Sequence, residues 1–467
     1  MKKTSQKILL FLLFGVFTLN SLAQTNYFGV SGNMVAGDFD YDGLLDDIAA
    51  FNTSGELPVL NLWMNQNAWV DEREANCQLP FDFLSAKSLN GKIVSGDFDN
   101  DGYRDDIAAI YEVGHNQTSI TVWINNDNVF TPQRWWYGAD FDANQVNQTV
   151  VVGDFDRDGY VDDIAAFYDY EQKRTKLYVW HSDGSKFNWP GTWWVGNDFN
   201  ATRIQGTVVA GDFDQDGFVD DITALYDYSD DFCKAFVWTT QGNKFNWPYT
   251  WFAQAGFAAG KAKGNIVSGD FDGNGYTDNV AALFAYDESS SSVMVFQRDK
   301  KGFAAPETWW YGSNEALNAK TRLVSGDFNN NARMHQFAGL LIDQNDARLT
   351  TWTADNHYFS TTEVIWQGQA LSAKDCENNG NCLPNELVQQ VNLFPNPNKG
   401  SFQVDVPVST DAQLALTIYN MLGAVVYETQ TATGSVWPVE LSELKSGNYM
   451  LQLVGAGVSV NQRFVVE

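Results

Sequence analysis

Acidic side chains recur in this 467-residue chain at a spacing suited to binding a hard cation. Counted from Asp38, carboxylates occupy the first, third, fifth and ninth positions of one segment, and Gly43 occupies the sixth. Alternating oxygen side chains can converge on one point, glycine permits the sharp turn between them, and a backbone carbonyl at the seventh position can add a ligand. Calcium fits such a loop better than magnesium, which requires stricter octahedral geometry.

The same loop occurs in five copies, which predicts about five structural calcium ions. The expected ligands are Asp38, Asp40, Asp42 and Asp46; Asp97, Asp99, Asp101 and Asp105; Asp154, Asp156, Asp158 and Asp162; Asp212, Asp214, Asp216 and Asp220; and Asp270, Asp272, Asn274 and Asp278. A sixth copy begins at Asp327 but has Ala332 in place of glycine and His335 at the ninth position, so we expect it to be empty or weak. A polar hairpin turn is the alternative for any single copy, but constant spacing across five copies favours calcium.

The loops mark an internal repeat, because their first residues are separated by 59, 57, 58, 58 and 57 residues. Each copy contains four short β-branched or aromatic runs separated by turn residues, without the apolar period of a helix. Four strands in about 40–60 residues correspond to one blade of a β-propeller. We therefore predict an all-β chain with a six-bladed β-propeller over residues 24–367, in which residues 27–29 complete the ring beside the last blade. A seventh, degenerate blade and an open β-solenoid are the alternatives.

Both ends of the chain carry further signals. Residues 1–23 combine lysines, an apolar run and small residues near position 23, as in a cleaved secretion signal, whereas the run is shorter than the roughly 20 residues that a membrane anchor needs. No later segment is long and apolar enough to span a bilayer. An exported chain permits disulfides, and Cys376 and Cys382 flank a turn-rich loop, so we expect this pair to be bridged. Cys77 and Cys233 fit buried thiols better than a second pair.

Composition excludes several classes of function. The chain has 29 Lys+Arg and 58 Asp+Glu, and a formal net charge of −29 would repel nucleic acid. Aromatic residues make up 15% of the chain, too much apolar surface for a disordered protein. The four histidines are scattered, and no metalloprotease motif, nucleophile elbow or phosphate-cradling loop is present. We therefore expect a binding protein and not an enzyme.

Two segments resemble known families. The GDFDxDGxxDDIAA repeats, over about 340 residues, resemble the FG-GAP or VCBS repeats of integrin alpha propellers and secreted bacterial propellers. The resemblance implies a calcium-stiffened extracellular propeller, which serves adhesion or ligand binding in some members and is attached to enzymes in others. After a linker at residues 368–390, residues 391–467 resemble the type A sorting domain of the type IX secretion system. Their alternating strands independently predict a small β-sandwich.

The sorting-domain resemblance carries its own implications. It rests on the blocks at residues 392–400, 416–423, 441–444, 446–451 and 463–466. It implies interaction with the type IX machinery, passage through the outer membrane of a Gram-negative bacterium, and removal of this domain with surface attachment or release. The remaining propeller would then act outside the cell, on a glycan or a surface protein.

Paired aromatic residues near the end of each repeat are candidates for ligand binding. A partly exposed tryptophan can stack on a sugar ring, and several weak sites together would give avidity. The candidates are Trp135, Trp136, Trp193, Trp194, Trp251, Trp309 and Trp310. Packing between blades is the alternative for most of them. We expect a carbohydrate-binding, lectin-like surface, with a protein-binding or structural adhesin as the alternative and a polysaccharide-active enzyme as a minor one.

Overall fold

The computed structural model describes residues 30, 32–53, 58–65, 70–80, 86–89, 91–228, 232–255, 257–285, 290–312, 323–331, 333–343, 346–355, 357–369, 392–394, 398–405, 413–420, 425–432, 436–441, 444–455 and 458–466. The predicted secretion signal, the strand at residues 27–29, most of the linker, Ala332 and the Cys376–Cys382 disulfide lie outside these residues. Contacts divide the chain into two compact units, residues 25–375 and residues 376–467 with 1–24. No helix within the described ranges is both long and apolar enough to cross a membrane.

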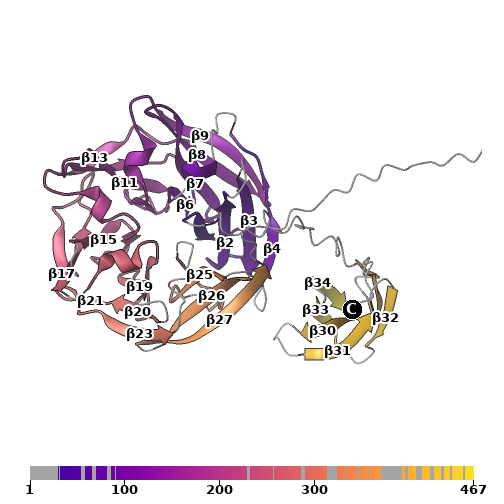
Figure 1. Ribbon diagram of the computed structural model, residues 1–467. Helices are drawn as coiled ribbons and strands as arrows, with labels where there is room; N and C mark the ends of the chain where they lie inside the picture. Colours follow the sequence, from indigo (N-terminus) through magenta and orange to yellow (C-terminus); the bar gives the residue numbers. More distant parts are fainter. Residues whose placement is uncertain are drawn as a thin grey trace, which may run out of the picture. The chain divides into compact units, whose positions relative to one another are not determined.

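The larger unit is a ring of six antiparallel sheets, which confirms the predicted six-bladed β-propeller (Figure 1). Each blade is a contiguous stretch of chain whose strands are paired in sequence order. The blades are β1–β4 (Met34–Gly37, Asp47–Asn52, Val59–Asn65, Val70–Glu74); β6–β9 (Ile93–Gly96, Asp106–Gly114, Gln117–Asn126, Val129–Gly138); β10–β13 (Val150–Gly153, Asp163–Asp169, Thr175–Trp180, Gly191–Gly196); β14–β17 (Val208–Gly211, Asp221–Asp227, Phe232–Trp238, Tyr249–Ala255); β18, β19, β20 and β23 (Ile266–Gly269, Asn279–Ala285, Ser291–Phe296, Glu307–Gly312); and β24–β27 (Val324–Gly326, Gln336–Asp343, Asp346–Asp355, Tyr358–Gln369).

Short elements fill the connections between these strands. Strand β5 (Asn76–Cys77) pairs with β9, and β21 (Arg298–Asp299) forms a small hairpin with β22 (Gly302–Phe303). The 3-10 helices η2 (Ala86–Leu89), η3 (Ala143–Val146), η4 (Ala201–Arg203) and η5 (Ala259–Ala262) each lead into the first strand of a blade. Because strand direction alternates within a blade, these helices lie at one end of the propeller, and the acidic loops and the hairpins between third and fourth strands lie at the other.

A repeating hydrogen bond joins the blades into a closed ring. The amide that opens each acidic loop donates to the carbonyl of the eighth residue in the next loop, as Asp38 does to Arg104 over 3.1 Å. The last of these bonds runs from Asp327 to Leu45 over 2.9 Å, so the sixth blade is joined directly to the first. The last blade draws all four strands from its own repeat. The prediction that residues 27–29 complete the ring beside this blade lies outside the described residues.

Aromatic side chains pack between neighbouring blades. The third-strand tryptophans Trp63, Trp123, Trp180, Trp238 and Trp352 are at most 1% exposed. Trp366 of the last blade packs edge-on against Trp63 of the first, with ring centroids 5.5 Å apart. Because neighbouring blades cover both faces of each sheet, second strands such as β2 are buried along their whole length and show no alternation of apolar and polar residues.

The smaller unit is the predicted C-terminal β-sandwich. One sheet contains β28 (Asn392–Phe394), β29 (Ser401–Asp405) and β32 (Val436–Glu440), and the other contains β31 (Val425–Ala432), β30 (Gln413–Asn420), β33 (Gly447–Gly455) and β34 (Val458–Val466). Phe402 from the first sheet and Leu416, Leu451 and Phe464 from the second belong to one buried core.

Candidate functional sites

Each acidic loop joins the first and second strands of a blade and folds around its own first carboxylate. In the first loop, Gly43 N donates to Asp38 Oδ2 over 3.0 Å, and Leu44 N donates to Asp42 Oδ1 over 2.9 Å. The sixth-position glycines have positive φ angles between 90° and 103°, a conformation that glycine adopts without strain. The equivalent bonds from the sixth and seventh residues recur in the second to fifth loops.

The folded loops bring together the carboxylates predicted as ligands. In four loops, one oxygen from each of the first, third and fifth residues lies within 4.8 Å of the others; the groups are Asp38, Asp40 and Asp42; Asp97, Asp99 and Asp101; Asp154, Asp156 and Asp158; and Asp212, Asp214 and Asp216. The fifth loop has the same turn, with Asn274 N 2.8 Å from Asp270 Oδ1. In the sixth loop, His335 stands at the ninth position, where its Nε2 is 3.4 Å from Asn331 Nδ2.

The ninth residue of each of the first five loops is a buried aspartate next to the other carboxylates. Burial and the neighbouring negative charges raise the pKa of Asp46 and Asp162 to about 8. Burial also raises the pKa of Asp220 to about 7, although the contact with Arg157 opposes this shift. Asp154 Oδ1 and Asp220 Oδ1 are buried oxygens with no hydrogen-bond partner. A bound divalent cation would satisfy such oxygens and stabilise the ionised carboxylates, so the donor set fits calcium.

The tenth residue braces the loop against the hairpin that follows the third strand, a role that the sequence analysis missed. Asp163 Oδ2 accepts a bond from Asp156 N over 3.0 Å, and Asp163 Oδ1 accepts one from Ser182 N over 2.9 Å. Asp47, Asp106 and Asp221 make the equivalent pairs of bonds in their own blades. The second aspartate of each Asp-Asp pair therefore has a structural role beside the predicted metal ligands.

In the third and fourth loops the fourth residue reaches the next loop, which is a second feature that the sequence analysis missed. Arg157 of the third loop lies 2.6 Å from Asp216 Oδ2 and 2.7 Å from Asp220 Oδ2 of the fourth loop. Gln215 Nε2 likewise donates to Asp278 Oδ2 of the fifth loop over 2.7 Å. The residues at this position have a left-handed backbone with φ between 55° and 73°; they are Tyr41, Asn100, Arg157, Gln215, Gly273 and Asn330.

The tryptophans predicted to bind a ligand lie mainly between blades. Trp135, Trp136, Trp193, Trp194 and Trp309 are at most 6% exposed, and Trp251 and Trp310 are only partly exposed. Their interpretation as ligand-stacking residues is therefore wrong for the five buried side chains. Adjacent residues of a strand normally face opposite sides, but the last strands of the second to sixth blades each have a register shift, such as that between Leu177 and Tyr178 opposite Trp193 and Trp194. This irregularity lets both members of a pair face the interior.

Two other tryptophans are exposed. Trp189 and Trp247 are 75% and 70% exposed, and each belongs to an Asn-Trp-Pro sequence in the hairpin before a last strand. Their rings lie 5.7 Å and 5.8 Å from those of Trp136 and Trp194, which the preceding blade supplies. The sequence Lys-Phe-Asn-Trp-Pro occurs twice, 58 residues apart, and this recurrence could have drawn attention to the two exposed tryptophans.

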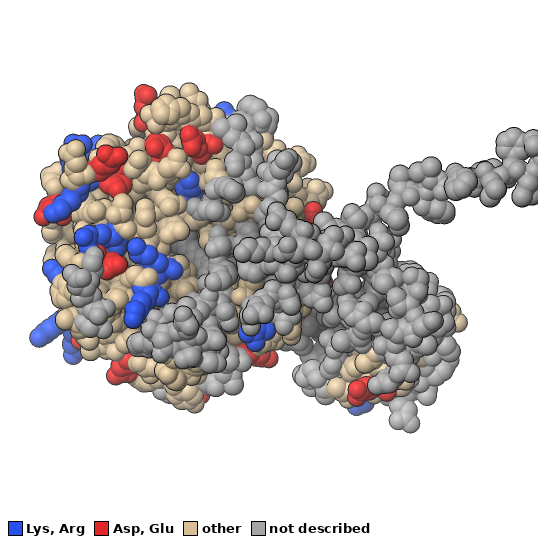
Figure 2. Space-filling view, viewed as in Figure 1, with Lys and Arg blue, Asp and Glu red and all other residues tan. Residues whose placement is uncertain are grey.

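Charge is distributed unevenly over the propeller. On the face shown in Figure 2, Lys and Arg gather over the region of β15 and β19, although the chain as a whole is acidic. Lys173, Lys261 and Lys263 are among the exposed cations near the 3-10 helices. Much of the acid excess is instead concentrated in the loops at the other end of the blades.

Comparison with known proteins identifies the C-terminal unit. Residues 392–467 match the family described as the secretion system C-terminal sorting domain. The match supports the predicted sorting domain and indicates export through a secretion system. The search of curated proteins found no match.

Solved structures with a similar arrangement include several propellers. The Dos1 propeller is 8% identical, with 93% of this chain and 92% of that chain covered and a TM-score of 0.34. A puromycin-hydrolyzing peptidase of Mycobacterium tuberculosis is 11% identical, with coverage of 77% and 47% and a TM-score of 0.36. The Nup133 β-propeller domain of Vanderwaltozyma polyspora is 9% identical, with coverage of 78% and 89% and a TM-score of 0.30.

Proposed function

We propose that this chain is a secreted or surface-attached, calcium-stabilised propeller that binds extracellular carbohydrate without catalysing a reaction. Its C-terminal unit would direct it through the type IX machinery, and the propeller would act outside the cell. The observation that carries the ligand proposal is the pair of exposed tryptophans, Trp189 and Trp247, at equivalent places in successive blades. Stacking on an exposed indole is a common way for a protein to hold the apolar face of a sugar ring.

The surroundings of these two side chains support a binding role. Each exposed indole is held at one side by a buried tryptophan of the preceding blade, and a proline follows it in the chain. A side chain that is already held in place loses little conformational entropy when a ligand binds. The two platforms are one blade apart, so a polymeric glycan that contacts both would bind more tightly than a single sugar.

The acidic loops and the tryptophan hairpins are physically linked. Asp163 bonds to Ser182 N at the start of the hairpin that carries Trp189, and Asp221 bonds to Thr240 N at the start of the hairpin that carries Trp247. Calcium in the adjacent loops would hold these aspartates in position. The proposed role of calcium is therefore to stabilise the folded propeller and the shape of its binding surface.

Glycan-array binding by the full chain in calcium tests the ligand proposal. We expect one class of glycan to bind, and Trp189→Ala with Trp247→Ala to abolish that binding while the melting temperature changes by only a few degrees. Tyr311→Ala is the matched control, because Tyr311 is 68% exposed on the last strand of another blade. This variant should bind the same glycan as tightly as the unaltered chain does.

Two outcomes would contradict the carbohydrate proposal. Undiminished glycan binding by the double variant would show that the exposed tryptophans are not the site. Binding of no glycan class by the calcium-loaded, folded chain would favour the alternative, a protein-binding adhesin, because exposed tryptophan and tyrosine side chains also serve as anchors at protein interfaces.

A further inference from the structure

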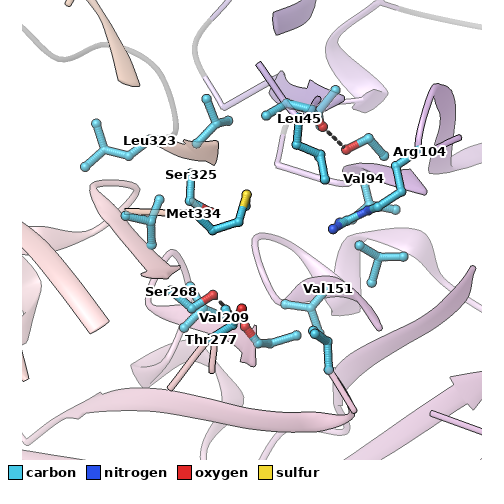
Figure 3. Close-up of a pocket in the computed structure, with 18 of the residues that line it drawn as sticks. Leu45, Val94, Arg104, Val151, Val209, Ser268, Thr277, Leu323, Ser325 and Met334 are labelled. Carbon is cyan, nitrogen blue, oxygen red and sulfur yellow. Dashed lines mark hydrogen bonds between the residues drawn. The ribbon is translucent and has the colours of Figure 1, made fainter. Parts of the chain in front are cut away.

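A cavity of about 170 Å³ lies on the axis of the propeller (Figure 3). All six first strands line it, and the eighth residues of several acidic loops close in on it. Its walls are mainly apolar and include Val94, Val151 and Val209. The hydroxyl groups of Ser95 and Ser268 donate to the carbonyls of Ala36 and Ala210, so these two serines have no hydrogen left to offer a ligand.

Arg104 places a positive charge in this otherwise apolar cavity. Figure 3 shows its guanidinium directed into the space between the strands. Equivalent positions of other loops carry Leu45, Val219, Thr277 or Met334, so a cation is not required by the fold at this place. The fold does not require this charge, and the guanidinium is partly withdrawn from water, so its presence here calls for another explanation.

The Arg104 side chain lacks a partner among the described residues. Its Nε is buried without a hydrogen bond, and none of the ion pairs within the described ranges includes it. Asp97 acts on the guanidinium only through space, and Asp97 is itself a predicted calcium ligand. Arg104 as a whole is partly exposed, but its Nε is withdrawn from water. The guanidinium remains charged, and its partial desolvation is unfavourable until an anion pairs with it.

We propose that the axial cavity binds a small monocarboxylate with an apolar body, held by the guanidinium of Arg104. The planar fork of an arginine matches the two oxygens of a carboxylate, and one cation compensates one negative charge. The valine walls suit a hydrocarbon and offer nothing to the hydroxyl groups of a sugar. Apolar cavities of about 150 Å³ hold a benzene ring, so benzoate is a probe of the right size. This inference is independent of the proposed glycan site.

Calorimetric titration of the full chain with benzoate tests the proposal. We expect binding at a single site, and at least tenfold weaker binding by Arg104→Met, which introduces the residue that the sixth loop carries at this position. Benzyl alcohol is the neutral control, and the substitution should leave its weak binding unchanged. Arg104→Lys keeps the charge but loses the fork, so it should retain only part of the affinity.

The same titrations can overturn the proposal. Equal benzoate affinity in the unaltered chain and in Arg104→Met would place the carboxylate elsewhere. Absence of benzoate binding at millimolar concentration by the folded chain would also contradict it. If Arg104→Met does not fold, the affinities of the unaltered chain for benzoate and for benzyl alcohol still test the proposal. Equal affinities would show that the carboxylate contributes nothing to binding.

Discussion

Arg157 introduces a permanent positive charge into a loop predicted to bind calcium. Its guanidinium contacts Asp216 and Asp220, which are the fifth and ninth residues of the fourth loop. The other loops receive a neutral side chain at this place, such as Gln215 in the fifth. The five loops that look alike in sequence should therefore differ in calcium affinity, with the fourth loop the weakest of the four that have a complete set of aspartates.

Replacing Arg157 with glutamine should raise the calcium affinity of the fourth loop, because the guanidinium and the ion compete for the same carboxylates. In the absence of calcium the variant should lose less than about 1 kcal/mol of unfolding free energy, since the Arg157 side chain is 34% exposed and solvent screens the ion pair. Calorimetric calcium titration measures the affinity. Lys173→Gln, which breaks an exposed ion pair with Asp198, is the control. Unchanged calcium binding by Arg157→Gln would refute the competition.

The sequence predicts the roles of some single residues and not of others, and the difference has a physical cause. The ligand aspartates were predictable because residue type and spacing along a turn largely determine where their oxygens converge. The bracing role of Asp163 was not, because it depends on which part of another strand lies opposite it. The contact of Arg157 with the next loop depends on a left-handed backbone at a residue that is not glycine, and residue type alone does not indicate this.

Elements in this molecule are arranged so that the exposed tryptophan of one blade packs on a buried tryptophan of the preceding blade, as Trp189 and Trp247 do. The four-strand pattern predicted the blades, because turn residues and β-branched runs are local signals. The irregular register of the last strands was not predictable, and it reversed the exposure expected for Trp193 and Trp194. The hairpins before the last strands instead carry the two exposed tryptophans, Trp189 and Trp247.

One hairpin adds a side-chain contact to the closure of the ring. Asn65 Nδ2 donates to Phe328 O over 2.9 Å and to Asn330 Oδ1 over 3.2 Å, which ties the first blade to the last. Asn65→Ala should lower the free energy of unfolding by about 1–3 kcal/mol, because buried acceptors lose their donor. Urea unfolding at fixed calcium measures this change.

Asn125→Ala provides the matched control for that measurement. Asn125 Nδ2 makes one longer bond, of 3.3 Å to Phe39 O, between two blades that are also consecutive in the chain, and its Oδ1 accepts a bond from Asn128 N over 2.9 Å within its own hairpin. We expect a smaller effect there, because the covalent connection keeps these blades together. An equal or larger loss in Asn125→Ala would show that ring closure adds nothing to the Asn65 contact.

Over the whole molecule, the acidic loops make stability depend on pH and calcium together. Without metal, burial and neighbouring carboxylates raise the pKa of Asp46 and Asp162 to about 8 and that of Asp47 and Asp106 to about 9, from an ordinary value near 3.8. Between pH 4 and pH 9 the folded chain therefore holds more protons than the unfolded chain. Its stability should be greatest at acid pH and should fall as the pH rises through these values.

Calcium should reverse that trend, because it binds the ionised carboxylates and protons compete with it. Thermal melts of the chelator-treated, dialysed chain should give a higher melting temperature near pH 5 than near pH 8, whereas calcium should raise the melting temperature most near pH 8. Magnesium at the same concentration is the control and should stabilise less, because it demands stricter geometry. A metal-free chain that is more stable near pH 8, or calcium stabilisation that grows on acidification, would contradict the assignment of these loops as cation sites.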